Sequence, residues 1–538
     1  MVPDDRTSEE TAVYQAARDA QASAQGEKKP NNDGVIQSEE KKKITGDLPD
    51  GRHELQEEEA YDKLGFSYPT HKKWRILTVI FIVQCSMNFN ASVYSNGVSL
   101  LQDKFGISAQ AGRVGQMVFL ICYAFGCELW APWSEEIGRW PTLQASLFLV
   151  NIWQILAALA PNYGTVIVAR ALGGLSSAGG SVTLGMVADM WDANNQQFAV
   201  AFVVFSSVFG SVIGPLVGPF IEVNLSWAWI CWVQLIFGGF VQILHFALVP
   251  ETRASVLLDR EARRLRKNGQ SNIYGPSEVK KNRFSAHEIL TTWARPFEMF
   301  VREPIVLCCS LLSGFSDALI FTFLEAFTPV YKQWGFSTEL MAATFVPIAI
   351  GYFIAWAIYI PTLWKQRQLI NSDEETPPEI RLKPLLYLAP LEAIGLFGFA
   401  WTSLGPPHVH WIAPMIFSAL VGIANYAIYM STIDYMIAAY GPYSASATGG
   451  NGLARDFLAG IAAMYSTPFY SNVGGESYRL HLEWPTTILA IVAVFVTIPI
   501  FVFYYKGAWF RKRSKFAETL AGERKQRRST KPAAKQAA

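Results

Sequence analysis

The sequence Gly210-Ser-Val-Ile-Gly214-Pro215-Leu-Val-Gly218-Pro219 lies inside an apolar run from about Phe198 to Ile221. Three glycines at intervals of four give one helix face a stripe without Cβ atoms, so that a neighbouring helix can approach closely. Pro215 removes a backbone hydrogen bond and is expected to bend the helix. Such breakers are tolerated in membranes, because neighbouring helices satisfy the freed groups. The run therefore predicts a membrane span.

The composition extends this prediction to the whole chain. Of the 538 residues, 51% are hydrophobic, 14% are aromatic and only 17% are charged, and the mean hydropathy is +0.19. The charges gather in the tails and in two internal loops, as is typical of a polytopic membrane protein. The six cysteines lie within predicted spans and are expected to pack as small apolar residues. No disulfide framework, metal-binding spacing or cleavable signal peptide is visible.

Twelve apolar runs of about 20 residues predict twelve transmembrane helices. The polar residues 1–70 predict a disordered cytoplasmic tail. The predicted spans are 75–96, 112–133, 141–160, 164–188, 198–221, 227–249, 304–330, 338–364, 384–403, 411–437, 446–471 and 484–506. The predicted domains are the tail 1–70, a six-helix bundle 71–249, a cytoplasmic linker loop 250–303, a second six-helix bundle 304–506 and a basic cytoplasmic tail 507–538.

The placement of Lys and Arg predicts that both termini are cytoplasmic. With the N-terminal tail inside, the basic residues of the approach to the first span, the linker loop and the C-terminal tail all fall on the cytoplasmic side. The opposite side then holds little more than Lys104, Arg113, Lys332 and Arg479. Asn224-Leu-Ser226 is a possible glycosylation sequon on the outer side, but it lies against the membrane and is expected to be unused.

The two halves each hold six predicted spans and a charged residue inside a span. The predicted fold class is thus an all-α polytopic membrane protein with two six-helix bundles. Two such bundles related by an axis along the membrane normal place a binding site near the midplane, between the halves.

One loop carries a family resemblance. Ala131-Pro-Trp-Ser-Glu135-Glu-Ile-Gly138-Arg139-Trp140-Pro resembles the signature loop of the major facilitator superfamily in its fungal multidrug version, Gly-Pro-Leu-Ser-Glu-x-x-Gly-Arg-Arg-Pro. Ala131 and Trp140 depart from that pattern. Glu135, Gly138 and Arg139 are the predicted cytoplasmic latch between the bundle halves, with the acid near a helix N-terminus and the arginine paired to a carboxylate. The alternative is an ordinary charged turn between helices.

Two more motifs extend the resemblance. Arg170-Ala-Leu-Gly173-Gly174 resembles the second motif, whose arginine is tied to proton coupling in the family; an arginine that only reaches toward the outer interface is the alternative. Gly210, Gly214, Pro215 and Gly218 align with the antiporter motif Gly-x-x-x-Gly-Pro-x-x-Gly-Gly, with Pro219 in the last position. This implies an antiporter, with the stripe as a hinge and seal against a helix of the other bundle.

Further matches cover nearly the whole membrane region and resemble the fungal twelve-span drug:proton antiporters. They include Pro250-Glu251-Thr252, Arg302-Glu303-Pro304 and Pro378-Glu379-Ile-Arg381-Leu. One departure is Gln196-Gln197, where the family usually carries Arg-Gly. The missing positive charge suggests a weaker inside latch.

Carboxyl groups within spans are the candidates for proton coupling, since burial moves their titration toward physiological pH. Asp317 and Glu325 lie eight residues apart, about 80° around a helix, so both could reach one cavity. The candidates for proton coupling are Arg170, Asp317, Glu325, Arg455 and Asp456. Glu128 and Glu392 are rivals, and a structural pairing role is the alternative for each of them.

Polar and aromatic residues in the spans that line the cavity of the superfamily are the candidate solute contacts. A site rich in amides and aromatics suits a mid-sized organic molecule, and Arg170 and Arg455 would favour an anion. The alternative for the aromatics is packing within the bundle. The candidates are Gln84, Asn88, Asn90, Phe321, Asn425, Tyr426 and Tyr429.

The expected function is proton-coupled export of a small organic molecule (drug, toxin, secondary metabolite, polyamine or organic acid) by rocking of the two bundles. A facilitator or importer on the same fold and a non-transporting membrane sensor are the alternatives. No enzyme motif is visible, so no cofactor is expected beyond the proton gradient. The expected partners are the solute, protons and the bilayer, with anionic inner-leaflet lipid at the basic tail, Arg511 to Arg528, and no nucleic acid. A monomer in the plasma membrane is expected, or in a vacuolar or other internal membrane. The sequence does not name the solute.

Overall fold

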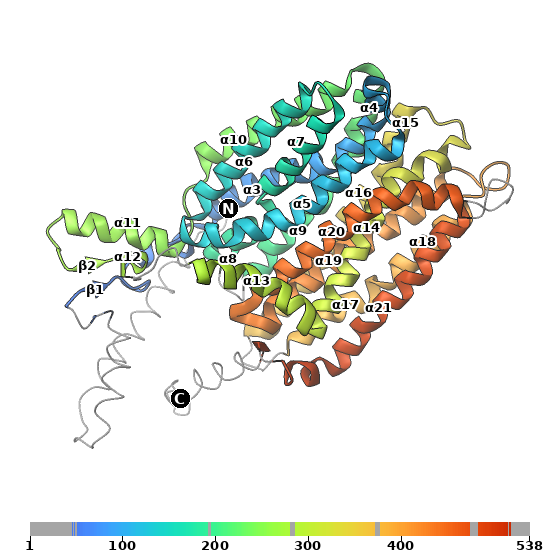
Figure 1. Ribbon diagram of the computed structural model, residues 1–538. Coiled ribbons are helices and arrows are strands. Elements are labelled where there is room, and N and C mark those ends of the chain that lie inside the picture. Colours follow the sequence, from blue (N-terminus) through green and yellow to red (C-terminus); the bar gives the residue numbers. More distant parts are fainter. Residues whose placement is uncertain are drawn as a thin grey trace, which may run out of the picture.

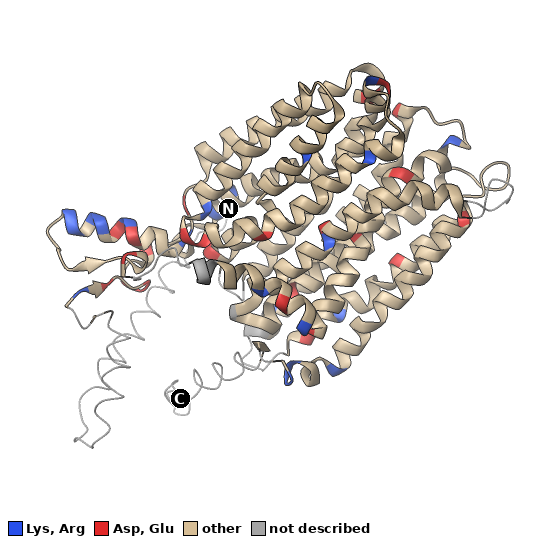
Figure 2. Ribbon diagram, in the orientation of Figure 1, with Lys and Arg blue, Asp and Glu red and all other residues tan. Residues whose placement is uncertain are grey.

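The computed structural model describes residues 46, 48, 51–191, 195–279, 286–371, 377–473, 482–514 and 516–517. Long helices run side by side in one bundle, with the first half of the chain lying beside the second (Figure 1). Charged residues gather at the ends of the bundle and along one helix outside it, with few in the middle (Figure 2). The predictions that fall on residues 1–45, on 280–285 of the linker loop, on Arg479 and on the tail beyond residue 517 lie outside the described residues.

The helices of the first half follow the predicted spans, with two interruptions. The first span continues through a 3-10 turn into a short helix, and the fourth is divided at Ser177 and Ala178. The elements are α3 (Thr70–Ser92), η3 (Val93–Gly97), α4 (Val98–Phe105), α5 (Ala109–Glu136), α6 (Arg139–Ala158), α7 (Tyr163–Ser176), α8 (Gly179–Met190), α9 (Gln196–Asn224) and α10 (Trp227–Leu248).

The second half repeats this plan after a helical linker. The linker contains α11 (Ala254–Lys267), β2 (Ile273–Tyr274), α12 (Pro276–Val279) and α13 (Ala286–Arg302). The second half contains α14 (Pro304–Lys332), α15 (Thr338–Met341), η4 (Ala342–Phe345), α16 (Val346–Asn371), η5 (Pro378–Leu382), α17 (Lys383–Leu388), α18 (Pro390–Thr402), α19 (Ile412–Tyr440), η6 (Gly441–Tyr443), α20 (Ser444–Asn472) and α21 (Glu483–Arg511).

Eleven helical segments among the described residues are long and apolar enough to cross a membrane. The chain is therefore a multi-pass membrane protein. The remaining long helix, α20, matches the predicted eleventh span but is less apolar and carries Arg455 and Asp456. It packs between α14 and α5, so its polar residues are shielded by protein. The count of twelve spans stays a prediction.

The two halves meet along two surfaces. On one of them, α20 of the second half packs against α5 of the first half, and residues of α14 belong to the same apolar cluster. On the other, α9 packs against α16 and α19, and one continuous apolar core joins α9 to the second half. These two surfaces hold the halves together in this structure.

Part of the predicted disordered tail is folded. β1 (His53–Glu54) pairs in parallel with β2, and η1 (Tyr61–Lys63) and η2 (Gly65–Ser67) follow it. Leu55, Ala60 and Leu64 form a small apolar core with Leu258 and Ala262 of α11. This tail–linker module lies outside the bundle at one end (Figure 1), which we call the linker end. The prediction of disorder is wrong for residues 51–69.

The glycine stripe of α9 packs closely, but not where it was expected. A Cβ at Gly210 would lie 2.8 Å from the carbonyl oxygen of Cys85, and a Cβ at Gly214 would lie 2.6 Å from the amide nitrogen of Val93. Both contacts are with α3 and η3 of the same half, so the expected seal against the other bundle is wrong. The opposite face of α9 is the one that meets the second half.

Candidate functional site

A buried charge cluster lies where α14, α19 and α20 of the second half meet. The guanidinium of Arg455 lies 3.7 Å from the carboxylate of Asp317 and 3.7 Å from that of its neighbour Asp456. It also covers the ring of Tyr429, 3.9 Å from its centroid. Consecutive residues do not share a helix face, but the long Arg455 side chain returns to Asp456. All three charged side chains are at least nine-tenths buried.

The first half contributes polar groups to this cluster. Arg455 Nη2 donates to the hydroxyl of Ser207 on α9, at 3.4 Å, and Gln84 Nε2 of α3 donates to the same hydroxyl at 3.5 Å. Glu128 of α5 approaches from the linker end, where its carboxylate lies against Gly449 of α20. The charge cluster therefore lies between the halves, as a site for alternating access requires.

Two polar groups at the cluster are not satisfied by the described residues. Nη1 and Nε of Arg455 make no hydrogen bond there, and neither does the side-chain oxygen of Gln84. Unsatisfied buried polar groups are uncommon, and each calls for an explanation. Donors of Arg455 and an acceptor of Gln84 are therefore available to a solute that enters between the halves.

Arg170 lies apart from this cluster, inside the first half. Its guanidinium donates to the backbone and side-chain oxygens of Asn90, at 3.2 and 2.9 Å, and lies 3.9 Å from the centroid of the Phe119 ring. The side chain is only 4% exposed, so it does not reach toward an outer interface. Its Nη2 makes no hydrogen bond to the described residues.

Glu325 belongs to a different site from Asp317. It pairs with Arg113 of α5 at 2.7 Å, across the two halves, and accepts from Thr467 at 3.0 Å. Both residues line a cavity of about 620 Å³ at the end of the bundle away from the linker, together with Glu222 and Lys332. Asp317 does not line it, so the expectation that Asp317 and Glu325 share one cavity is wrong. Sequence reasoning missed Arg113 because its partner is 212 residues away.

The predicted solute contacts divide into four groups. Gln84 and Tyr429 lie at the charge cluster, and Asn90 lies against Arg170. In the second half, Asn425 donates to Ser316, which in turn donates to the rival carboxyl Glu392. The remaining three residues are packed: Asn88 against its own helix and α9, Phe321 in an apolar cluster, and Tyr426 against the carbonyl of Ala201.

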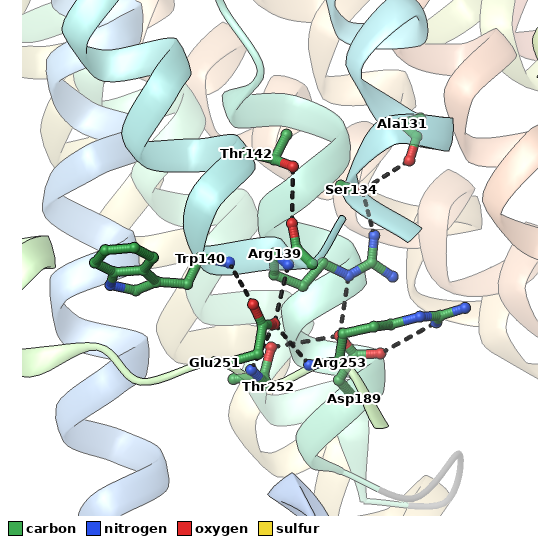
Figure 3. A network of polar contacts seen from close by, with 10 residues as sticks. Ala131, Ser134, Arg139, Trp140, Thr142, Asp189, Glu251, Thr252 and Arg253 are labelled. Carbon is green, nitrogen blue, oxygen red and sulfur yellow. Dashed lines mark hydrogen bonds and ion pairs between the residues drawn. The ribbon is translucent and has the colours of Figure 1, made fainter. Parts of the chain in front are cut away.

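The predicted latch forms a polar network at the linker end (Figure 3). Arg139 Nε pairs with Asp189 at 2.9 Å, and its Nη1 donates to Ser134 at 2.6 Å. Arg253, at the start of the linker, lies 3.5 Å from the same aspartate. Asp189 was not among the predicted site residues. The network ties α5, α6 and α8 to the linker within one half, so it is not a latch between the two halves.

Glu251, rather than Glu135, is the acid at the helix N-terminus. Its carboxylate accepts from the backbone amides of Arg139 and Trp140, at 3.0 and 3.3 Å, where α6 begins. Gly138 turns the chain there with φ of +118°, and a Cβ on it would lie 2.3 Å from that carboxylate. Amide donors and the helix dipole both favour a negative charge at this position.

The second half has a corresponding network. Arg381 of η5 pairs with Asp434 of α19, and Arg511 pairs with Glu379 at 2.8 Å. Each half thus pins the arginine of an inter-helix loop to an aspartate near the end of a helix. This internal correspondence is clearer in the structure than in the sequence.

Comparison with known proteins identifies the family. The family model described as Major Facilitator Superfamily matches residues 80–464. The efflux pump atB of Aspergillus terreus is 34% identical over 403 residues, which cover 72% of this chain and 81% of that protein. The MFS-type transporter kojT of Aspergillus flavus is 30% identical over 455 residues, covering 82% and 79%.

Solved structures agree on the fold. The proton:xylose symporter XylE bound to 6-bromo-6-deoxy-D-glucose superposes with a TM-score of 0.56 at 17% identity, covering 81% of this chain and 97% of that one. This likeness shows the fold alone. Together with the family match and the fungal relatives, it means that this chain belongs to the major facilitator superfamily, among its fungal exporters, as a membrane transporter of small solutes and not an enzyme.

Proposed function

We propose that the protein is a proton-coupled exporter that exchanges protons for a small organic molecule at the Arg455 cluster. The observation that carries the proposal is one buried arginine between two aspartates where the halves meet. With all three groups ionised the cluster carries one excess negative charge, and an uncompensated buried charge is costly. A proton on either aspartate removes that charge.

Proton binding and solute binding then compete at one place. A solute that donates to the ionised carboxylate of Asp317 or Asp456 competes directly with a proton for that carboxylate, so solute and proton exclude each other. Because Ser207 and Gln84 belong to the other half, movement of the halves alters this balance as the cluster opens to each side in turn. Arg455 adds hydrogen-bond donors for an accepting group elsewhere on the same solute.

The direction of transport is supported by the antiporter motif and by relatives. The relatives include the efflux pump atB of Aspergillus terreus and the MFS-type efflux pump MFS2 of Trichophyton rubrum, which is 31% identical over 462 residues. Another is the citrinin biosynthesis cluster transporter mrr1 of Monascus ruber. We place the protein in the plasma membrane as a monomer, with the linker end cytoplasmic and the proton gradient as its only energy source.

Purified protein in vesicles with an acidic lumen tests the proposal. Citrinin, rhodamine 6G and spermidine serve as chemically different probes, with a luminal pH dye and protein-free vesicles as the reference. An exporter of this kind accumulates a probe in the acidic lumen while protons leave. Solute and proton movement in the same direction would indicate a symporter, and transport indifferent to the gradient a facilitator.

Variants locate the coupling group. Asp317→Asn and Asp456→Asn are expected to abolish gradient-driven accumulation while solute exchange at equal pH remains. Glu392→Gln is the matched control, because Glu392 is also buried in the second half but is hydrogen bonded to Ser316 rather than placed beside Arg455. Coupled transport by both aspartate variants would exclude the cluster as the proton site.

A further inference from the structure

One contact between the halves at the linker end involves Gln196-Gln197, the pair of residues that departs from the family pattern. When the side-chain amide of Gln197 is oriented with its oxygen toward Arg381, that oxygen accepts hydrogen bonds from Nη1 and Nη2 of Arg381, each at 3.1 Å. Gln197 lies in the first turn of α9 in the first half, and Arg381 belongs to η5 in the second. Gln197 is 1% exposed, so water competes little for this contact.

The neighbours of this contact fix its geometry. Arg381 also pairs with Asp434, whose side chain is 5% exposed, so the guanidinium cannot turn away without leaving a buried carboxylate unpaired. Deeper along α9, the carbonyl of Ala201 accepts from the hydroxyl of Tyr426 at 3.1 Å, again across the halves. The ring of Phe198 meets that of Trp364 with centroids 5.2 Å apart.

We propose that Gln197 is a positioning residue of the transport cycle: its side-chain oxygen holds Arg381 across the two halves and stabilises the form that is closed at the linker end. A neutral acceptor suits this position. The glycine of the family pattern would offer Arg381 no side chain, and an arginine would place two guanidinium groups together at the N-terminus of α9, where positive charge is unfavourable.

The inference corrects the expectation drawn from the missing arginine. Loss of positive charge at this loop predicts a weaker closure at the linker end. In the structure, the charged guanidinium of Arg381 instead donates to Gln197. A hydrogen bond from a charged donor is stronger than one between neutral groups. The inference rests on the rocking of the halves in the proposed function, but it holds for either direction of transport and without proton coupling.

Hydrogen exchange of the full chain in lipid nanodiscs, without solute or gradient, tests it. Gln197→Ala is expected to raise exchange about tenfold in residues 196–206 and 377–388, which corresponds to about 1.4 kcal/mol. Exchange in residues 95–105 and 325–332 at the other end is expected to fall, because one end closes as the other opens. A merely loosened structure would instead raise exchange at both ends.

Three further variants complete the test. Gln197→Arg is expected to open the linker end at least as far as Gln197→Ala. Gln197→Glu keeps an acceptor for Arg381 and is expected to exchange like the unchanged chain. Gln196→Ala is the matched control, since Gln196 is the adjacent buried amide, and it is expected to have no effect. The proposal is overturned if Gln197→Ala exchanges as the unchanged chain does, if Gln196→Ala opens the linker end equally, or if exchange rises at both ends.

Discussion

At the scale of single residues, Gly214 shows why the stripe on α9 admits no side chain. A Cβ there would lie 2.0 Å from the hydroxyl of Ser92 and 2.6 Å from a backbone nitrogen, which cannot turn aside. Gly214→Leu is therefore expected to lower stability by about 1–3 kcal/mol through overpacking. Gly239→Leu is the control, because a Cβ at Gly239 meets nothing within 4 Å. Thermal unfolding in detergent micelles measures both, and equal midpoints would contradict the argument.

Glu251 gives a second prediction at this scale. Glu251→Ala removes the acceptor of the first backbone amides of α6, so a loss of about 1–2 kcal/mol is expected, as for a helix cap. Glu135→Ala, at the acid of the signature loop, is expected to change the unfolding midpoint less. The ordering of the two midpoints decides which acid caps the helix, and a larger shift for Glu135→Ala would reverse the assignment.

These residues also show where sequence reasoning stops. The pattern around Arg139 indicates that the arginine pairs with a carboxylate, and it does. It does not indicate that the partner is Asp189, 50 residues on, or that the acid at the helix N-terminus is Glu251, 112 residues on. Local spacing predicts the need for a partner, whereas the packing of α6, α8 and the linker supplies it.

At the scale of elements, the tail–linker module depends on a few apolar side chains. Leu64 is fully buried against α11, whereas Tyr61, three residues earlier, is 50% exposed. Leu64→Asp is expected to release residues 53–68 and raise their hydrogen exchange at least tenfold, because a carboxylate cannot be buried there unpaired. Tyr61→Asp should leave exchange unchanged, and if it releases the tail equally, the apolar core is not what holds it.

The pH response of this module follows from Glu278. Hydrogen bonds from Arg266 and Arg263 and from the Gly275 amide lower its pKa from 4.5 to about 2. A carboxyl group whose pKa is lowered by folding stabilises the folded form at any pH above its ordinary pKa. That contribution is lost as the pH falls from about 4.5 toward 2. The protection of residues 273–279, which is their exchange corrected for the intrinsic pH dependence of amide exchange, is therefore expected to respond to Glu278→Gln but not to pH between 5 and 8. A change with pH in that window would contradict the assignment.

Hydropathy predicted the spans because bilayer thickness fixes their length, and the helices of the structure follow them closely. The folded tail was missed for a physical reason. Leu55, Ala60 and Leu64 are too few to form a core alone, and the apolar face that completes it lies about 200 residues later, on α11. Composition alone therefore favoured disorder.

At the scale of the whole molecule, a second contact between the halves lies at the end away from the linker. Arg113 and Glu325 join α5 to α14 at 2.7 Å, and each side chain is only 12% exposed. Next to this pair, Gln110 donates to the carbonyl of Met464 at 2.8 Å. Among the described residues, each end of the bundle thus carries a charged contact across the halves, and any movement that opens an end must break the contact there.

Breaking the Arg113–Glu325 pair is therefore expected to open the end away from the linker. Gln197→Ala is expected to have the opposite effect at that end. Glu325→Gln weakens the pair without removing the hydrogen-bonding group, and a cysteine introduced at Ser95, which lines the cavity, reports the opening. Its labelling by a membrane-impermeant maleimide is expected to accelerate several-fold. Charge exchange, Arg113→Glu with Glu325→Arg, should restore slow labelling, since the attraction does not depend on which half carries which charge. Fast labelling of the exchanged pair would mean that another contact, such as that of Gln110, closes this end.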